Sequence, residues 1–112
     1  MNGAVLAGIL DVASADDVLR LAFEEAQQRG ADLRVMATAP HAELTDTVDR
    51  WSAKYPDVPV SVVIRHVIDP AITLAAATRT CCLAVLARPT DTRATAVVRA
   101  VARRAGCPLV IA

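Results

Sequence analysis

Two arginines and two threonines surround the expected start of a helix late in the chain, and their side chains are suited to binding an anion. These residues are Arg88, Thr90, Thr92 and Arg93. Guanidinium groups, hydroxyls and the free N–H groups of a helix N-terminus can together hold a phosphate. Asp91, which lies among them, adds a negative charge and can cap the helix itself. A phosphate site and an ordinary polar turn before a capped helix therefore both fit this segment.

Few other residues have a spacing that indicates catalysis or metal binding. Asp11, His66 and Asp69 lie at or near the ends of expected strands and are the candidates for acid–base chemistry. His41 and His66 lack the spacing of metal ligands. The sequence contains no nucleophile elbow and no zinc or calcium motif. We therefore expect no catalytic residues, no metal site and a protein that is not an enzyme.

The three cysteines show neither a disulfide framework nor a metal-binding pattern. Cys81 and Cys82 are neighbours, and Cys107 stands alone. An odd number without CxxC spacing is typical of buried, reduced thiols in a cytoplasmic protein. A redox-sensing role for Cys81 or Cys82 is the alternative, which burial would oppose.

Charge is balanced over the whole chain but divided unevenly along it. The 112 residues carry a net charge of zero, yet residues 1–70 hold 11 acids and 6 bases, whereas residues 71–112 hold one acid and 6 arginines. The overall balance argues against a nucleic-acid partner, and no apolar run is long enough to span a membrane. Arg99, Arg103 and Arg104 would line the outer side of the last helix, either as a solvated surface or as a surface for a protein partner.

Five apolar segments alternate with amphipathic ones. The expected strands are residues 4–9, 33–38, 60–67, 82–87 and 108–112. Ser14 to Asp17 has the form of a capping box, and Gly30 stands where the first helix should end. Pro40 would begin the second helix, and Asp69 with Pro70 would begin the third, which extends to about residue 79.

The last helix would be capped by Thr92 or Asp91 and stopped by Gly106. Its inward-facing side chains are expected to be Ala94, Val97, Val98, Val101 and Ala105. Strands that alternate with helices indicate βαβ crossovers, which produce a parallel sheet with helices on both faces. We therefore expect residues 1–112 to form one three-layer α/β domain.

Several segments together resemble the universal stress protein family. They are Leu19–Ala26, the run Arg29-Gly30-Ala31, residues 55–60, residues 69–74, and residues 98–101 leading into Gly106-Cys107-Pro108 and an apolar end. The resemblance implies a five-stranded parallel sheet of order 3-2-1-4-5. It also implies a dimer through the last strand, where Leu109, Val110 and Ile111 would form an uncharged edge that favours pairing with another strand.

Many members of this family bind ATP through a glycine-rich loop of the form G-x-x-G-(about nine)-G-(S/T). The glycines of this chain are Gly3, Gly8, Gly30 and Gly106. The family's loop glycines would fall on Ala87, Thr90 and Thr95, and Pro89 removes an N–H donor. The glycine expected before the proline of the third helix would be Ile68. We therefore expect a branch of the family that lacks the ATP-binding motif.

The family also places an aspartate after the first strand, near the adenine and ribose. In ungapped register this position is Leu10, and Asp11 comes one residue later, so a shift at the turn would restore it. The resulting expectation is a non-enzymatic, homodimeric regulatory or binding module without a cofactor. The alternative is a protein that binds an adenine nucleotide such as ATP, or another phosphate ligand, through Asp11 and the Arg/Thr segment.

Overall fold

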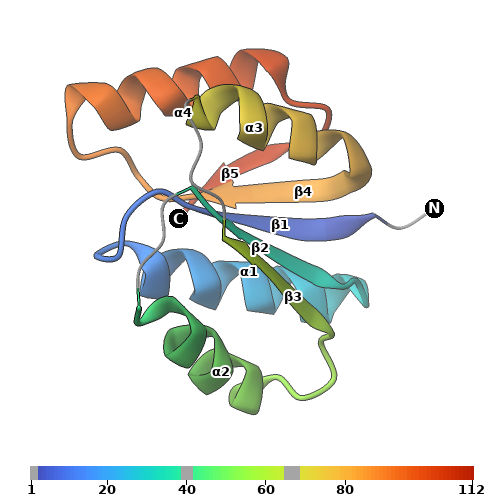
Figure 1. The fold of residues 1–112 in the computed structure, drawn as a ribbon. Coiled ribbons are helices and arrows are strands. Elements are labelled where there is room, and N and C mark those ends of the chain that lie inside the picture. Colours follow the sequence, from blue (N-terminus) through green and yellow to red (C-terminus); the bar gives the residue numbers. More distant parts are fainter. Residues whose placement is uncertain (1–2, 39–41, 65–68) are drawn as a thin grey trace.

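The computed structural model describes residues 3–38, 42–64 and 69–112 (Figure 1). The strands are β1 (Ala4–Ile9), β2 (Leu33–Ala37), β3 (Val60–Ile64), β4 (Cys81–Leu86) and β5 (Leu109–Ile111). The helices are α1 (Ala15–Arg29), α2 (Leu44–Lys54), α3 (Pro70–Ala77), the short 3₁₀ helix η1 (Thr78–Thr80) and α4 (Thr92–Arg104). Within the described ranges, none of these helices has the length and apolar character that crossing a bilayer requires.

The five strands form one parallel sheet in the order β3-β2-β1-β4-β5. The expected α/β class and strand order are confirmed. Strand β1 lies at the centre, with Ala7 between Val35 of β2 and Val85 of β4. Both faces of β1 are covered, which explains why Val5 to Ile9 contains no polar side chain.

Helices α1 and α2 cover one face of the sheet, and α3 and α4 cover the other (Figure 1). On the first face, Phe23 of α1 and Val35 of β2 are wholly buried. On the second face, Leu74 of α3 and Val101 of α4 pack against Leu6 and Leu86. Alternate residues of the strands therefore belong to two separate cores, one under each helical layer.

Three of the expected helix ends are confirmed. Gly30 ends α1 with a φ of 62°, a left-handed conformation that glycine adopts without steric cost. Asp69 caps α3 by accepting hydrogen bonds from the N–H groups of Ala71 and Ile72, and Pro70 is the first residue of that helix. Of the two candidates for the α4 cap, the structure selects Asp91.

The capping box expected at Ser14 is wrong. The side chain of Ser14 makes no capping hydrogen bond to α1, because the residue has helical dihedral angles and its hydroxyl donates back to the carbonyl of Asp11. The Asp11 carboxylate accepts from the Ser14 N–H instead, at 2.9 Å. The polar group that closes this turn therefore lies three residues earlier than the motif predicted.

Other differences concern the ends of elements. Strand β2 ends one residue early, β4 is shifted by one residue, and β5 is shorter than expected. The third helix stops at Ala77 and continues as η1, and only Val101 of the expected inward residues of α4 is fully buried. The three-residue strand β5 beneath α4 offers little surface to pack against. Pro40 and residues 65–68, where the second helix and third strand had further predicted positions, lie outside the described residues.

The thiols differ in burial. Cys81 is buried, as expected, but Cys82 and Cys107 are only partly so. The Cys81 thiol donates to the carbonyl of Ala77 at 3.3 Å and receives a long contact from the Arg34 guanidinium at 3.8 Å. Burial raises the pKa of Cys81, although Arg34 and Thr80 act in the opposite direction. Burial also raises the pKa of Cys107.

We expect the raised pKa of the Cys81 thiol to make the folded state less stable at alkaline pH. The unfolded thiol ionises near its ordinary value of 9.0 while the folded one stays neutral, so stability is lost as pH rises from there through the folded pKa. The measurement is the free energy of unfolding in urea as pH is raised through this range. Cys81→Ala should show a shallower decline than the parent; identical slopes would contradict the assignment.

Candidate functional site

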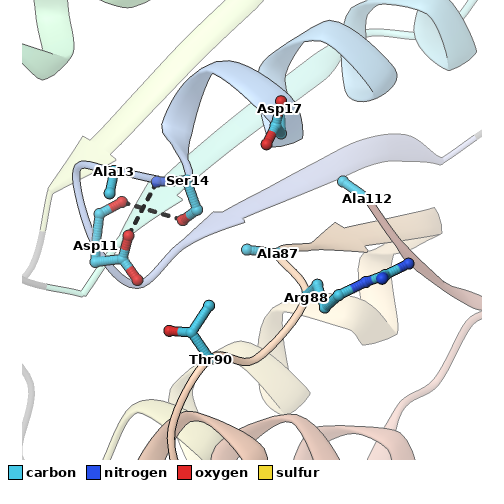
Figure 2. A pocket seen from close by; sticks show the side chains of 8 residues that line it. All are labelled: Asp11, Ala13, Ser14, Asp17, Ala87, Arg88, Thr90 and Ala112. Carbon is cyan, nitrogen blue, oxygen red and sulfur yellow. Dashed lines mark hydrogen bonds between the residues drawn. The ribbon is translucent and has the colours of Figure 1, made fainter.

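A pocket of about 390 Å³ opens where β1 and β4 end, beside the start of α1 (Figure 2). In open α/β folds, ligands bind at this edge, outside the carboxyl ends of the strands. The lining residues are Asp11, Ala13, Ser14, Asp17, Ala87, Arg88, Thr90 and Ala112. The pocket therefore joins the turn after β1 to the loop after β4.

Acidic groups dominate the α1 side of the pocket. Asp11 accepts from the Ser14 N–H, and Asp16 and Asp17 both lie in the first turn of α1. The partial positive charge of a helix N-terminus ordinarily attracts anions, but acidic side chains in the first turn neutralise it. Asp16 is further engaged by the indole N–H of Trp51 at 2.9 Å. The start of α1 is thus already supplied with negative charge.

The start of α4 is occupied in the same way. Asp91 accepts from the N–H of Ala94 at 2.7 Å, and the Thr95 hydroxyl donates to the Asp91 carbonyl at 2.8 Å. This cap uses one of the N–H groups that a bound phosphate would require. Thr92 and Arg93 are exposed at this helix start and are not among the described residues that line the pocket.

Three of the five residues predicted to bind a ligand meet in the pocket. These are Asp11, Arg88 and Thr90, whereas Thr92 and Arg93 lie on α4 outside its lining. In Figure 2, Arg88 lies across the pocket from Asp11. With two carboxylates, one guanidinium and two hydroxyls, the lining can hydrogen-bond a polar ligand but carries net negative charge. A polyanion would meet repulsion from Asp11 and Asp17.

Sequence reasoning missed Ser14 and Asp17 as pocket residues. The sequence did contain a signal for them, because Asp11 is a residue type that often closes a turn by accepting from an N–H two or three residues on. Such a turn brings the start of α1 back toward the end of β1. The turn before α1 could therefore have been predicted from the spacing of Asp11 and Ser14, rather than from a capping box at Ser14 and Asp17.

Of the other candidates for chemistry, the structure describes only Asp69. Asp69 is used as the cap of α3. His41, His66 and Ile68 lie outside the described residues. Within residues 3–38, 42–64 and 69–112, no group of three or more histidine, cysteine or acidic side chains is arranged to hold a metal ion.

The positions that would carry glycines in a phosphate loop carry side chains here. Ala87 and Thr90 both line the pocket, so a Cβ stands at each place where a backbone N–H would need to approach a phosphate. Pro89, between them, has no N–H. The loop after β4 therefore offers side-chain hydroxyl and guanidinium groups rather than a cradle of backbone amides.

At the far edge of the sheet, β5 pairs only with β4 in the described part of the chain. Leu109 and Val110 are partly buried, and Ile111 is 40% exposed. The N–H of Ala112 and the carbonyl of Pro108 bond to β4. Because alternate residues of a strand turn their polar groups to opposite sides, those of Leu109 and Ile111 face outward. An apolar, uncharged edge is left open to a further strand.

The order of the strands and the pocket at their carboxyl ends define a doubly wound α/β protein. Solved structures with a similar fold are those of universal stress proteins. One from Archaeoglobus fulgidus, in complex with dAMP, superposes with a TM-score of 0.68 at 19% identity, covering 97% of this chain and 96% of that one. One in complex with cAMP gives 0.70 at 21%, covering 99% and 96%.

A family protein from Burkholderia pseudomallei gives a TM-score of 0.65 at 20% identity, covering 98% of this chain and 95% of that one. No protein-family model matches the sequence, and no curated protein matches it. The chain therefore has the universal stress protein fold over nearly its whole length, at sequence identities that show the fold alone.

Proposed function

We propose that this chain is a non-enzymatic, universal-stress-type regulatory module that acts through protein contacts and does not use ATP. The observation that carries this proposal is that, at the start of each helix next to the pocket, a carboxylate already accepts a hydrogen bond from a backbone N–H. Asp11 and Asp91 accept the hydrogen bonds of N–H groups that a phosphate would otherwise receive. The glycine-free loop after β4 is consistent with a branch that lacks the ATP-binding motif.

The proposed module is a dimer that pairs through β5. The uncharged edge of Leu109, Val110 and Ile111 supports this, since edge strands in monomers are usually blunted by charge, proline or a bulge. A homodimer that adds strand to strand would extend the sheet across two chains. Three cysteines without disulfide spacing favour a reducing compartment, the cytoplasm.

The second candidate function is binding of an adenine nucleotide or another phosphate ligand. Two structures with this fold are complexes with dAMP and cAMP, each of which has a single phosphate. The pocket volume of about 390 Å³ lies within the usual range for small-molecule sites. In this case Arg88 would hold the phosphate, Asp11 would meet the ribose or adenine, and Thr90 would assist, with Thr92 and Arg93 nearby on α4.

Isothermal titration with Mg·ATP, and in parallel with AMP, distinguishes the two. If the protein does not use ATP, the titration should give no binding heat at high micromolar protein, because carboxylates face any phosphate placed in the pocket. Micromolar binding that Arg88→Ala abolishes would overturn this proposal in favour of the nucleotide-binding one. Arg99→Ala is the matched control, since it removes an exposed arginine away from the pocket.

A further inference from the structure

The two helical layers of this molecule carry opposite charge. The layer of α1 and α2 with its loops, residues 15–32 and 42–59, holds nine carboxylates and four basic side chains. The other side, residues 69–112, holds six arginines and two carboxylates, Asp69 and Asp91. Both of these carboxylates are engaged as helix caps. A net charge of zero thus conceals a separation of charge across the sheet.

The arginines of α4 are exposed and concentrated on its outer side. With Val101 facing the core, a helical period of 3.6 residues places Arg99 and Arg103 on the opposite side, one turn apart. Arg93 and Arg104 are also exposed. The three ion pairs found in the described part of the chain all involve side chains of α1 or α2.

Arg99 and Arg103 stand at positions i and i+4, where like charges repel each other along a helix. Three of their neighbours on α4 are alanines, Ala96, Ala100 and Ala102, while Val101 between them faces the core. A helix selected only for contact with water would ordinarily intersperse acids with its bases. Arginine rather than lysine is instead enriched at interfaces.

Helix α2 carries two acidic side chains that take part in none of the ion pairs of the described residues. Its two basic side chains are engaged elsewhere, since Arg50 pairs with Asp16 and Lys54 lies over the ring of Trp51. Leu44 and Val48 are buried against the core, so Asp46 and Asp49 lie on the outward side of α2, about one turn apart. Both are exposed. The spacing of the two aspartates along α2 therefore matches that of the two arginines along α4. Helices α2 and α4 lie on opposite faces of the sheet (Figure 1), so these charges cannot meet within one chain.

We propose that α4 of one copy docks against α2 of a second copy, with Arg99 and Arg103 facing Asp46 and Asp49. The contact joins unlike surfaces, so each copy offers one of each and association can continue from copy to copy. It differs from pairing of β5 edges, which joins identical surfaces through apolar and main-chain contacts. The inference is therefore independent of the proposed function and of the β5 dimer.

Sedimentation velocity at low and high salt tests this contact. Between about 20 mM and about 500 mM NaCl the screening length falls severalfold, so the association constant should fall by about tenfold or more. Pairing through β5 should survive in high salt and supplies the baseline. A sedimentation coefficient that is unchanged by salt would overturn the proposal.

Two charge-reversed variants test which surfaces meet. Arg99→Glu with Arg103→Glu, and separately Asp46→Lys with Asp49→Lys, should each lose the salt-dependent association. An equimolar mixture of the two should regain it, since each then finds an opposite charge on the other. A mixture that stays at the high-salt size would overturn the pairing of α4 with α2.

Three further double variants control for indirect effects. Arg20→Glu with Lys54→Glu makes the same change in net charge on the α1–α2 layer and should preserve or strengthen association. If a reversed variant melts early, the neutral pairs Arg99→Ala with Arg103→Ala, and Asp46→Asn with Asp49→Asn, give the same test. Loss of association in the Arg20/Lys54 control as well would show that net charge alone is responsible and would contradict the proposal.

Discussion

Replacing Ile111 with lysine is expected to turn the dimer proposed above, which pairs through β5, into a monomer. Ile111 lies on the open edge of β5 and is 40% exposed, so the fold of one chain loses little. In a dimer paired through β5, the same side chain from two copies would come close to the two-fold axis, where two ammonium groups would repel each other. A lysine on an edge strand is also a usual means of preventing edge-to-edge pairing.

Light scattering after size-exclusion chromatography, in high salt, measures this change as a halving of the mass. The matched control is Val62→Lys, which places the same charge on β3 at the other edge of the sheet, where Val62 is 38% exposed. The control should remain a dimer. An Ile111→Lys protein with the parent's mass, or a Val62→Lys protein that dissociates, would show that β5 is not the interface.

Replacing Phe23 with alanine is expected to remove a large part of the stability of the fold. Phe23 is wholly buried in the core between the sheet and the α1–α2 layer, and its ring stacks on Tyr55 with centroids 5.5 Å apart. Tyr55 follows the last turn of α2, so this contact ties α2 to α1. Truncating a buried phenylalanine costs about 3–5 kcal/mol. The chain has no other phenylalanine and few bulky side chains that could fill the cavity.

Urea unfolding followed by circular dichroism measures this loss. Stability should fall in the order parent, Tyr55→Ala, Phe23→Ala, because Tyr55 is only partly buried whereas Phe23 is wholly buried. Arg20→Ala, on the exposed side of the same helix, is the control and should change stability little. A loss below about 1 kcal/mol for Phe23→Ala would contradict the packing described for this core.

The class of fold could be predicted from the sequence because the residues that begin and end its helices act locally. Gly30 ends α1 and Asp69-Pro70 begins α3 through interactions within a few residues, which any chain segment with these residues can make. Alternating strands and helices then imply a parallel sheet. The order of the strands could not be predicted in this way, since alternation alone does not specify it. The expected order, which is confirmed, came from the resemblance to the universal stress proteins.

The predictions were wrong where the surroundings of a side chain depend on elements that are distant in the sequence. The apolar stripe of α4 predicted several buried residues, but only Val101 is fully buried, because the depth of burial depends on the width of the sheet beneath the helix. At the candidate site, Arg88 and Thr90 could be predicted as neighbours of a strand end. That Asp17 would join them depends on how the turn after β1 folds back, which Asp11 and Ser14 decide together.

At both helix starts near the pocket, a carboxylate already accepts a hydrogen bond from a backbone N–H group that a bound phosphate would need. Titrating ¹⁵N-labelled protein with Mg·ATP, and separately with inorganic phosphate, while following the amide signals of Ser14, Asp17 and Ala94 tests it most directly. The signals of Ser14 and Ala94 should stay in place at about millimolar ligand, since Asp11 and Asp91 hold their N–H groups. The Asp17 signal should stay in place as well, because the Asp11 and Asp17 carboxylates repel an anion there. Shifts that saturate at these amides would contradict the account and show a phosphate bound at the helix starts.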